Sequence, residues 1–218
     1  MKATEFEDIL QFWFPPLPSG NPEALVRRWE WWFRGGGNQE IMEYFAPLLE
    51  RAIRGELASW SQEPRSRLAL IIVLDQFSRV IYQGSALAFA QDEQACALTI
   101  EGIEIGHYAA LATPWEKTFF FLPLSHAEQD WARNQELVVS LADELVATAL
   151  PAHQVMLEFS AAQAHRHREV LNKFERHPHR NELLGRRSTP AELEYLASGQ
   201  LIHTRPFPPN LAKYLARD

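Results

Sequence analysis

The chain has 218 residues, which is enough for one or two globular domains with a substantial hydrophobic core. Hydrophobic residues make up 46% and charged residues 22%, a composition that excludes a disordered or fibrous chain. The formal net charge of -7 argues against a general nucleic-acid-binding protein. The single cysteine, Cys96, excludes a disulfide framework and any metal site built from several cysteines.

The N-terminal segment lacks the pattern of a targeting peptide, because it carries Glu5, Glu7 and Asp8 in place of basic residues and an apolar run. The longest apolar stretch, residues 68–74, is ended by Asp75. It is far shorter than the roughly 20 residues that a membrane-spanning helix needs. We therefore expect a cytoplasmic protein that does not enter a membrane, and a lone thiol fits that reducing compartment.

Helix signals cover nearly the whole chain. In three places a threonine is followed three residues later by a glutamate, which is the capping box of a helix start. These boxes are Thr4–Glu7, Thr113–Glu116 and Thr189–Glu192. The periodicity of apolar residues, with these starts and with glycine or proline stops, predicts about nine helices. They are expected over residues 4–14, 22–33, 38–54, 64–82, 92–105, 114–122, 127–148, 151–174 and 190–198.

Further residues mark helix boundaries and breaks. Asn21, Asn38 and Asp92 are expected to cap helices, and Pro47 predicts a kink or break near Tyr44. No convincing period-2 strand or hairpin turn is present in the sequence. The pattern therefore predicts an all-α protein without a sheet, a single domain over residues 1–218 whose helices pack as antiparallel pairs across short loops.

The expected helix over residues 64–82 is unusual because it carries charge inside an apolar run. Asp75 and Arg79 are four residues apart, so they share a face and are able to pair, and Gln76 lies beside them. One interpretation is a buried structural ion pair that is satisfied internally. The other is the wall of a functional site, because burial of charge is costly and calls for a reason.

A second polar segment follows the apolar residues 119–124. His126 and Glu128 are expected near the start of the long helix over residues 127–148. An acid in a first helical turn is favourable with the helix dipole, which is a purely structural interpretation of Glu128. The functional alternative is that both side chains project from a helix end into a cleft.

The C-terminal part carries a basic block: residues 163–190 hold seven Arg or Lys against three acids. Arg166, Arg176 and Arg187 are expected to form a solvated face. His179, Arg180 and Asn181 follow Pro178 in a loop, where a guanidinium and backbone amides are able to hold an oxyanion. Histidines crowd the same block at positions 165, 167, 177 and 179.

These histidines do not predict a metal site. His165 and His167 are two residues apart on one helix, so they point to different sides and do not easily chelate one ion. No HExxH motif accompanies His177 and His179. We expect no metal and no cofactor.

Several short motifs resemble one known family. They are Phe12-Trp13-Phe14, Gly55-Glu56-Leu57 with Trp60, Leu74-Asp75-Gln76-Phe77 with Arg79, Pro178-His179-Arg180-Asn181, Leu184-Gly185-Arg186 and Ser188-Thr189-Pro190. From Ile9 to Leu196 the chain resembles the bacterial domain-of-unknown-function family 924. It departs from the family pattern at Ser78 and Val80, where the family has proline and asparagine.

The resemblance implies an all-helical fold similar to the tetratricopeptide superfamily, with a superhelical arrangement, and no established activity. It also implies which polar residues belong to the family pattern. These are Asp75, Gln76, Arg79, His126, Glu128, His167, Arg168, His179, Arg180 and Asn181.

Three functions fit these residues, and the sequence leaves open whether the protein is an enzyme. The first is a binding module for an anionic small molecule or an acidic peptide. The second is a metal-independent enzyme that performs acid–base work. The third is a scaffold with a buried polar network. The ligand-binding candidates are Arg79, Glu128, His167, Arg168, Arg180 and Asn181, and the catalytic candidates are Asp75, His126 and His179.

Two structural expectations follow. Asp75 should be buried within hydrogen-bonding range of Arg79 or of residues 179–181. The polar segments should converge on a single site, because separate clusters would each carry a desolvation cost. The Asp75 carboxylate and the Arg180 guanidinium should then lie within about 15 Å, beyond which salt screens their interaction.

Overall fold

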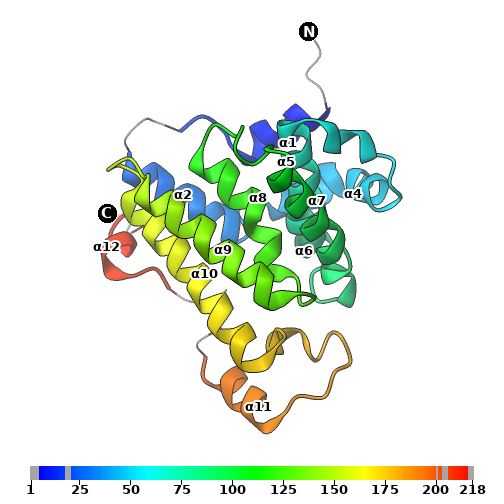
Figure 1. Cartoon of the computed structure of the whole chain (residues 1–218), viewed down its shortest axis with the longest axis vertical. Coiled ribbons are helices and arrows are strands. Elements are labelled where there is room, and N and C mark those ends of the chain that lie inside the picture. The colour runs from blue at the N-terminus through cyan, green and yellow to red at the C-terminus, as the bar shows by residue number, and fades with distance from the viewer. Residues whose placement is uncertain (1–4, 18–20, 200, 203–205, 216–218) are drawn as a thin grey trace. The chain divides into compact units, whose positions relative to one another are not determined.

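The computed structural model describes residues 5–17, 21–199, 201–202 and 206–215. Over these residues the regular structure is helical, without a β-strand, so the protein is all-α as predicted (Figure 1). Contacts group the chain into two compact units, one formed by Met1–Pro16 and Gly35–Ala127 and the other by Leu17–Arg34 and Glu128–Asp218. The single domain and the superhelical arrangement stay predictions.

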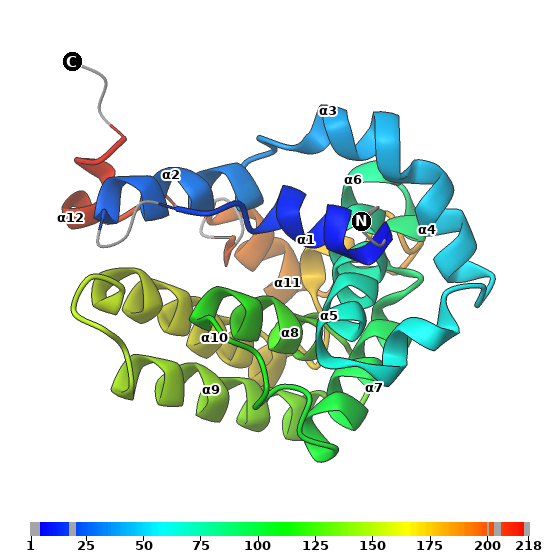
Figure 2. The same ribbon diagram turned by 90° about the horizontal axis from the view of Figure 1, so that it is seen from above.

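Unit 1 is built around one buried helix. Its elements are α1 (Glu5–Trp13), α3 (Asn38–Glu40), the π-helix η1 (Ile41–Phe45), α4 (Ala46–Ile53), the 3₁₀-helix η2 (Ala58–Gln62), α5 (Pro64–Ile72), the π-helix η3 (Val73–Phe77), α6 (Ser78–Ile81), the 3₁₀-helix η4 (Ala86–Phe89), α7 (Asp92–Glu104) and α8 (Pro114–His126). Helix α5 contacts α1, α7 and α8 (Figure 2). Leu68 to Leu74 are all at most 3% exposed, because neighbours cover this apolar run on every side.

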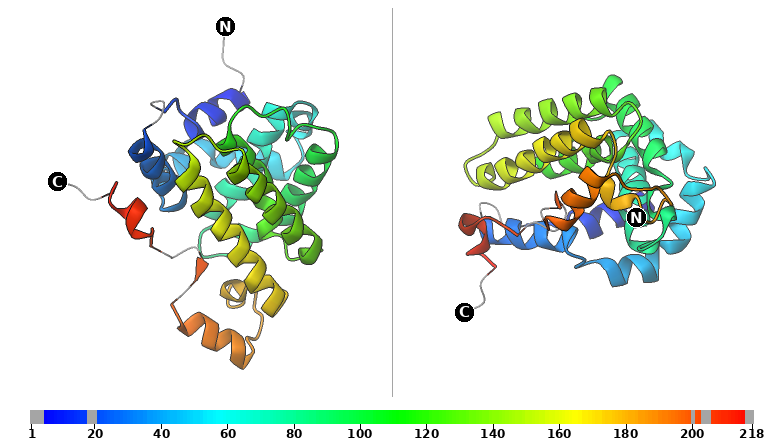
Figure 3. Two further views of the ribbon diagram at one scale, coloured as in Figure 1. Left: turned by 60° about the vertical axis from the view of Figure 1, so that its left-hand side comes forward. Right: turned by 90° about the horizontal axis from the view of Figure 1, so that it is seen from below.

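Unit 2 is dominated by two long helices. It contains α2 (Pro22–Phe33), α9 (Trp131–Ala147), α10 (Gln154–Phe174), the 3₁₀-turn η5 (Pro178–Arg180), α11 (Pro190–Ala197) and α12 (Pro209–Ala212). All views show α9 and α10 side by side, joined by a short loop as an antiparallel pair (Figure 1, Figure 3). Trp29 of α2 packs its ring against Phe159 of α10 and against Phe207, with both centroids 5.0 Å away.

Some predicted helix boundaries are confirmed and others are wrong. Asn21 caps α2, and the boxes at Thr113 and Thr189 are complete; Thr4 lies outside the described residues. Asn38 and Asp92 are not caps, because the cap positions fall one residue earlier, and Asp92 turns its carboxylate to Arg79 instead.

The boundary between the sixth and seventh expected helices is also wrong. Helix α8 continues through Pro123 to His126, and α9 begins only at Trp131. His126 is therefore the last residue of α8, and Glu128 lies in the connection. Neither residue opens the long helix.

Both π-helices interrupt long expected helices. The kink or break predicted near Tyr44 falls in η1, where a π-turn interrupts the α-helix but the chain stays helical into α4. The second, η3, splits the helix expected over residues 64–82 and carries Asp75. Short π-segments inside α-helices are rare and are frequent at functional sites, where the wider turn redirects side chains.

Candidate functional site

Asp75 is a buried carboxylate, 1% exposed, held by three side chains of unit 1. Its Oδ1 lies 2.7 Å from His126 Nδ1 at the end of α8. The same oxygen lies 3.4 Å from Arg79 Nη1, and Oδ2 accepts a short hydrogen bond from Gln76 Nε2. The predicted burial of Asp75 and its pairing with Arg79 are confirmed.

Arg79 connects this carboxylate to a second one. Its Nη2 donates to Asp92 Oδ1 at 2.8 Å, and its Nη1 donates to the backbone oxygen of Asp75 at 2.6 Å. Asp92 is 5% exposed, so both carboxylates of this arrangement are buried. The guanidinium expected to bind an anionic ligand is thus engaged with two acids of the protein.

The pKa values of Asp75 and His126 fix their charges. Burial opposes ionisation of Asp75, but the charges of Arg79 and His126 and the hydrogen bonds to the carboxylate outweigh it and hold its pKa well below the usual range. Burial lowers the pKa of His126, and the Arg79 charge lowers it further, while Asp75 acts in the opposite direction. At neutral pH the pair is therefore a carboxylate and a neutral imidazole.

These charge states assign the histidine tautomer. A carboxylate only accepts hydrogen bonds, so the His126 Nδ1 beside it carries the proton and donates. The lone pair of the neutral ring is then on Nε2. In this state His126 is a proton acceptor whose orientation is set by Asp75.

Glu128 organises a second polar cluster, in unit 2. Its Oε1 accepts from the backbone N–H of His177 at 2.7 Å, and its Oε2 accepts a short hydrogen bond from Arg186 Nη1. Arg186 also donates to the carbonyl of His177 at 3.1 Å. Glu128 and Arg186 together therefore fix the backbone of the loop after α10.

Three histidine rings gather beside this loop. The ring of His177 lies 5.7 Å from that of His167 and 5.5 Å from that of His179, measured between centroids. Arg180 and Asn181 are 4% and 1% exposed. Among the described residues, no group of three or more His, Cys, Asp or Glu side chains is placed to hold a metal ion.

Arg168 of α10 contacts a histidine outside this group of three rings. Its Nη2 lies 3.2 Å from His165 Nδ1, and His165 Nε2 lies 2.9 Å from Asp143 Oδ1 of α9. This chain of contacts connects α10 to α9 at a partly exposed position, so Arg168 contributes to a link between two helices.

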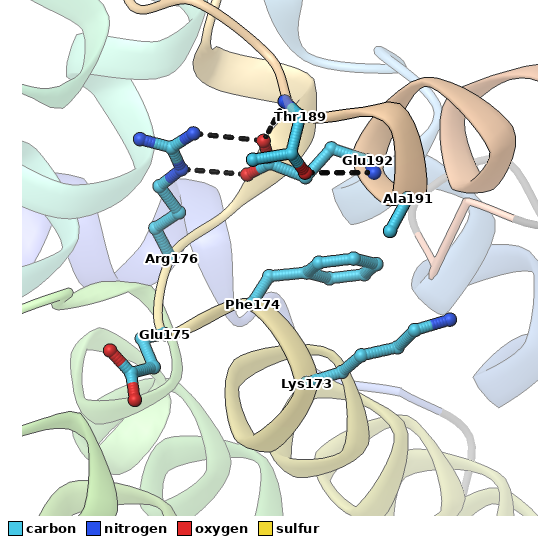
Figure 4. Close-up of a pocket in the computed structure, with 7 residues that line it drawn as sticks. All are labelled: Lys173, Phe174, Glu175, Arg176, Thr189, Ala191 and Glu192. Carbon is cyan, nitrogen blue, oxygen red and sulfur yellow. Dashed lines mark hydrogen bonds and ion pairs between the residues drawn. The ribbon is translucent and has the colours of Figure 1, made fainter.

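Arg176 is not the solvated charge that the sequence pattern predicts. Its Nε and Nη2 donate to the two oxygens of Glu192 at 2.6 and 2.8 Å, and Figure 4 shows this pair above the ring of Phe174. The hydrogen bond from Arg176 lowers the pKa of Glu192 to about 2. The pair borders a cavity of about 540 Å³ between the end of α10 and α11.

The sequence-predicted residues fall into two groups. Asp75, Gln76, Arg79 and His126 come together in unit 1. The others belong to unit 2: Glu128, His167, Arg168, His179, Arg180 and Asn181. Convergence on a single site, including the expected distance between Asp75 and Arg180, stays a prediction because these residues belong to different units.

The site thus consists of a buried aspartate on a π-segment and a histidine at the end of α8, within an all-helical fold, and this arrangement alone defines no reaction. Residues 9–200 match the family described as bacterial protein of unknown function (DUF924), and the chain belongs to that family. It is similar to the solved structure of a protein of unknown function, ATU0120, from Agrobacterium tumefaciens, with 29% identity and a TM-score of 0.66 over 89% of this chain and 97% of the other. No curated protein matches the chain.

Within the described residues, no helix is both long enough and apolar enough to cross a membrane. The cytoplasmic location stays a prediction.

Proposed function

We propose that the protein is an enzyme whose acid–base group is His126, with Asp75 as the residue that positions it. The observation that carries this proposal is the 2.7 Å contact between Asp75 Oδ1 and His126 Nδ1 within a buried cluster. A carboxylate in this place holds the ring in one tautomer, directs Nε2 toward a reacting proton and stabilises the imidazolium that forms.

The surroundings of the pair support this role. Arg79 and Gln76 bind Asp75, so the carboxylate is fixed before any substrate arrives. His126 keeps 14% of its side chain exposed, whereas Asp75 is fully enclosed. The lowered pKa of His126 keeps the ring neutral and able to accept a proton near pH 7.

A second candidate function is binding of an anionic small molecule or an acidic peptide in unit 2. It is favoured by the burial of Arg180, which belongs to the same short segment as His177 and His179. Arg79 supports it less, because its guanidinium already binds Asp75 and Asp92. The third interpretation is a purely structural polar network. It predicts that His126 does not react, whereas the acid–base proposal predicts that it does.

Acylation by diethyl pyrocarbonate tests the proposal without a known substrate, because the reagent attacks neutral, accessible imidazole nitrogen. Peptide mass spectrometry should find His126 acylated, at a slower rate in Asp75→Asn. A panel of esters, phosphoesters and amides should then identify turnover that His126→Gln abolishes. Protection of His126 while other histidines react would contradict the proposal and favour a structural network.

Anion binding is tested separately. Thermal-shift titrations with phosphate and citrate should stabilise the protein only if unit 2 binds anions, and Arg180→Gln should remove that effect. His126→Gln should leave it unchanged, so the two candidate functions are distinguished by different variants.

A further inference from the structure

One face of α10 is lined by cavities along its whole length. Residues of α10 that border them recur at helical spacing, from Val155 through Ala162 and Arg166 to Lys173. Arg166 borders two of the cavities. All of the lining residues belong to unit 2. The cavities therefore form a row along this face, which we call the groove, and Arg166 borders both the second and the third of them.

The cavity at the N-terminal end of α10 is mainly apolar. It has a volume of about 670 Å³ and is bordered by Phe159 and Ala162 of α10 and by Phe207 and Leu211 of the C-terminal segment. The rings of Phe159 and Phe207 are 5.2 Å apart and both pack on Trp29, so this wall is fixed by mutual aromatic contacts. The volume is in the range of small-molecule sites.

The neighbouring cavity has a mixed lining, in which apolar side chains such as Val170 and Phe174 accompany charged ones, and its charged residues have an excess of positive charge. It measures about 360 Å³ and is bordered by Arg166 and Lys173 against a single acid, Glu169. The side chains of Tyr195 and Ser198 from the α11 end also border it. A cavity of this kind favours an anionic group placed beside Arg166.

We infer that this groove binds a fatty acid, with its carboxylate at Arg166 and its hydrocarbon chain in the apolar cavity. The proposal is independent of the acid–base centre, which lies in unit 1. Arg166 follows Val155 by eleven positions of helix, about 16 Å, which suits an extended chain of about a dozen carbons. Burial of that chain supplies the affinity, and the cation supplies the orientation.

Glu158 sets the direction of the ligand. It borders the apolar cavity on the same face as Arg166, two helical turns away, and accepts a hydrogen bond from Gln154 at 2.9 Å. Its negative charge disfavours a carboxylate at that end of the cavity. The groove should therefore prefer a monocarboxylate to a dicarboxylate of the same length.

Isothermal titration of the full chain with dodecanoate, below its micelle concentration, tests the inference. We expect saturable binding, with dodecanol and dodecanedioate weaker and butyrate without measurable binding. Arg166→Gln should weaken dodecanoate binding by about tenfold or more, since a charged hydrogen bond is lost. Ala162→Phe, which fills the tail cavity, should abolish binding. Arg133→Gln, an exposed cation on α9, is the matched control and should bind as the wild type does.

Three outcomes would overturn the inference. Equal affinity for dodecanoate and dodecanol would show that Arg166 does not select the head group. Unchanged binding by both Arg166→Gln and Ala162→Phe, with their folds verified by circular dichroism, would place the ligand elsewhere. An equal loss in Arg133→Gln would indicate non-specific adsorption. His126→Gln should bind dodecanoate normally, so failure here is distinguishable from failure of the acid–base proposal.

Discussion

His126 Nδ1 and Asp75 Oδ1 lie 2.7 Å apart although 51 positions separate the two residues in the chain. The contact joins the π-segment η3 to the last residue of α8, so it depends on where α8 ends as well as on the wider turn that carries Asp75. Because Arg79 of α6 then links Asp75 to Asp92 at the start of α7, the Asp75–Arg79 pair connects four helical elements, η3, α6, α7 and α8.

Asp75→Ala should destabilise the fold strongly, because it removes one partner of a buried charge pair, by about 3 kcal/mol or more. Glu101→Ala is the matched control: Glu101 also binds a guanidinium, that of Arg67 at 2.9 Å, but its own side chain is 59% exposed. Its loss should cost less than that of Asp75, because the buried Arg67 keeps its hydrogen bonds to the backbone oxygens of Ser61 and Leu98. Urea unfolding measures both, and equal midpoints would contradict the burial of Asp75.

His126 should be present as the Nδ1–H tautomer at neutral pH, because a carboxylate beside Nδ1 requires a donor there. Nitrogen-15 chemical shifts of the imidazole measure this directly. In Asp75→Asn the preference should weaken, since an amide is able to donate as well as accept. A wild-type spectrum dominated by the Nε2–H form would contradict the assigned geometry.

The sequence predicts Asp75 well and its partners only in part. A charge that follows seven apolar residues has to be buried, and Arg79 one turn later is a natural partner. Asp92 is missed, because an acid at a helix start is ordinarily a cap. Only tertiary packing, which places α7 beside η3, turns it toward Arg79.

The π-segments and the end of α8 are two further features that the sequence does not predict. A π-turn depends on hydrogen bonds to the fifth residue and leaves no clear residue pattern, so η3 is not predicted. Pro123 favours a helix stop, yet α8 continues for three residues. Pro123 and Leu124 are both buried, so burial of this segment outweighs the local preference.

Stability should fall as the pH drops below about 6.5, where histidine in the unfolded chain takes up a proton. Burial lowers the pKa of His126 in the folded protein, so over this range the unfolded state binds more protons and stability rises with pH. His126→Gln should reduce the slope by at most about 1.4 kcal/mol per pH unit. Urea unfolding between pH 5 and 8 measures it.

His107 adds to the same slope, because burial and the Arg67 charge lower its pKa too. His126→Gln should therefore flatten the profile without abolishing the pH dependence, and the double variant with His107→Gln should flatten it further. A steeper profile in either variant would mean that the pKa of the replaced histidine is raised by folding, which contradicts the expected lowering.

Glu192→Gln should loosen α11, because Glu192 both completes the capping box with Thr189 and binds Arg176. Loss of this charged hydrogen bond should cost about 1–3 kcal/mol of local stability. Since the pKa of Glu192 is lowered to about 2, its contribution to stability is complete above the ordinary glutamate pKa and disappears as the pH falls toward 2.

Amide hydrogen exchange over α11 measures the effect of Glu192→Gln. Glu194→Gln, an exposed change on the same helix, is the control, and equal exchange in the two variants would contradict a stabilising role for the Arg176–Glu192 pair.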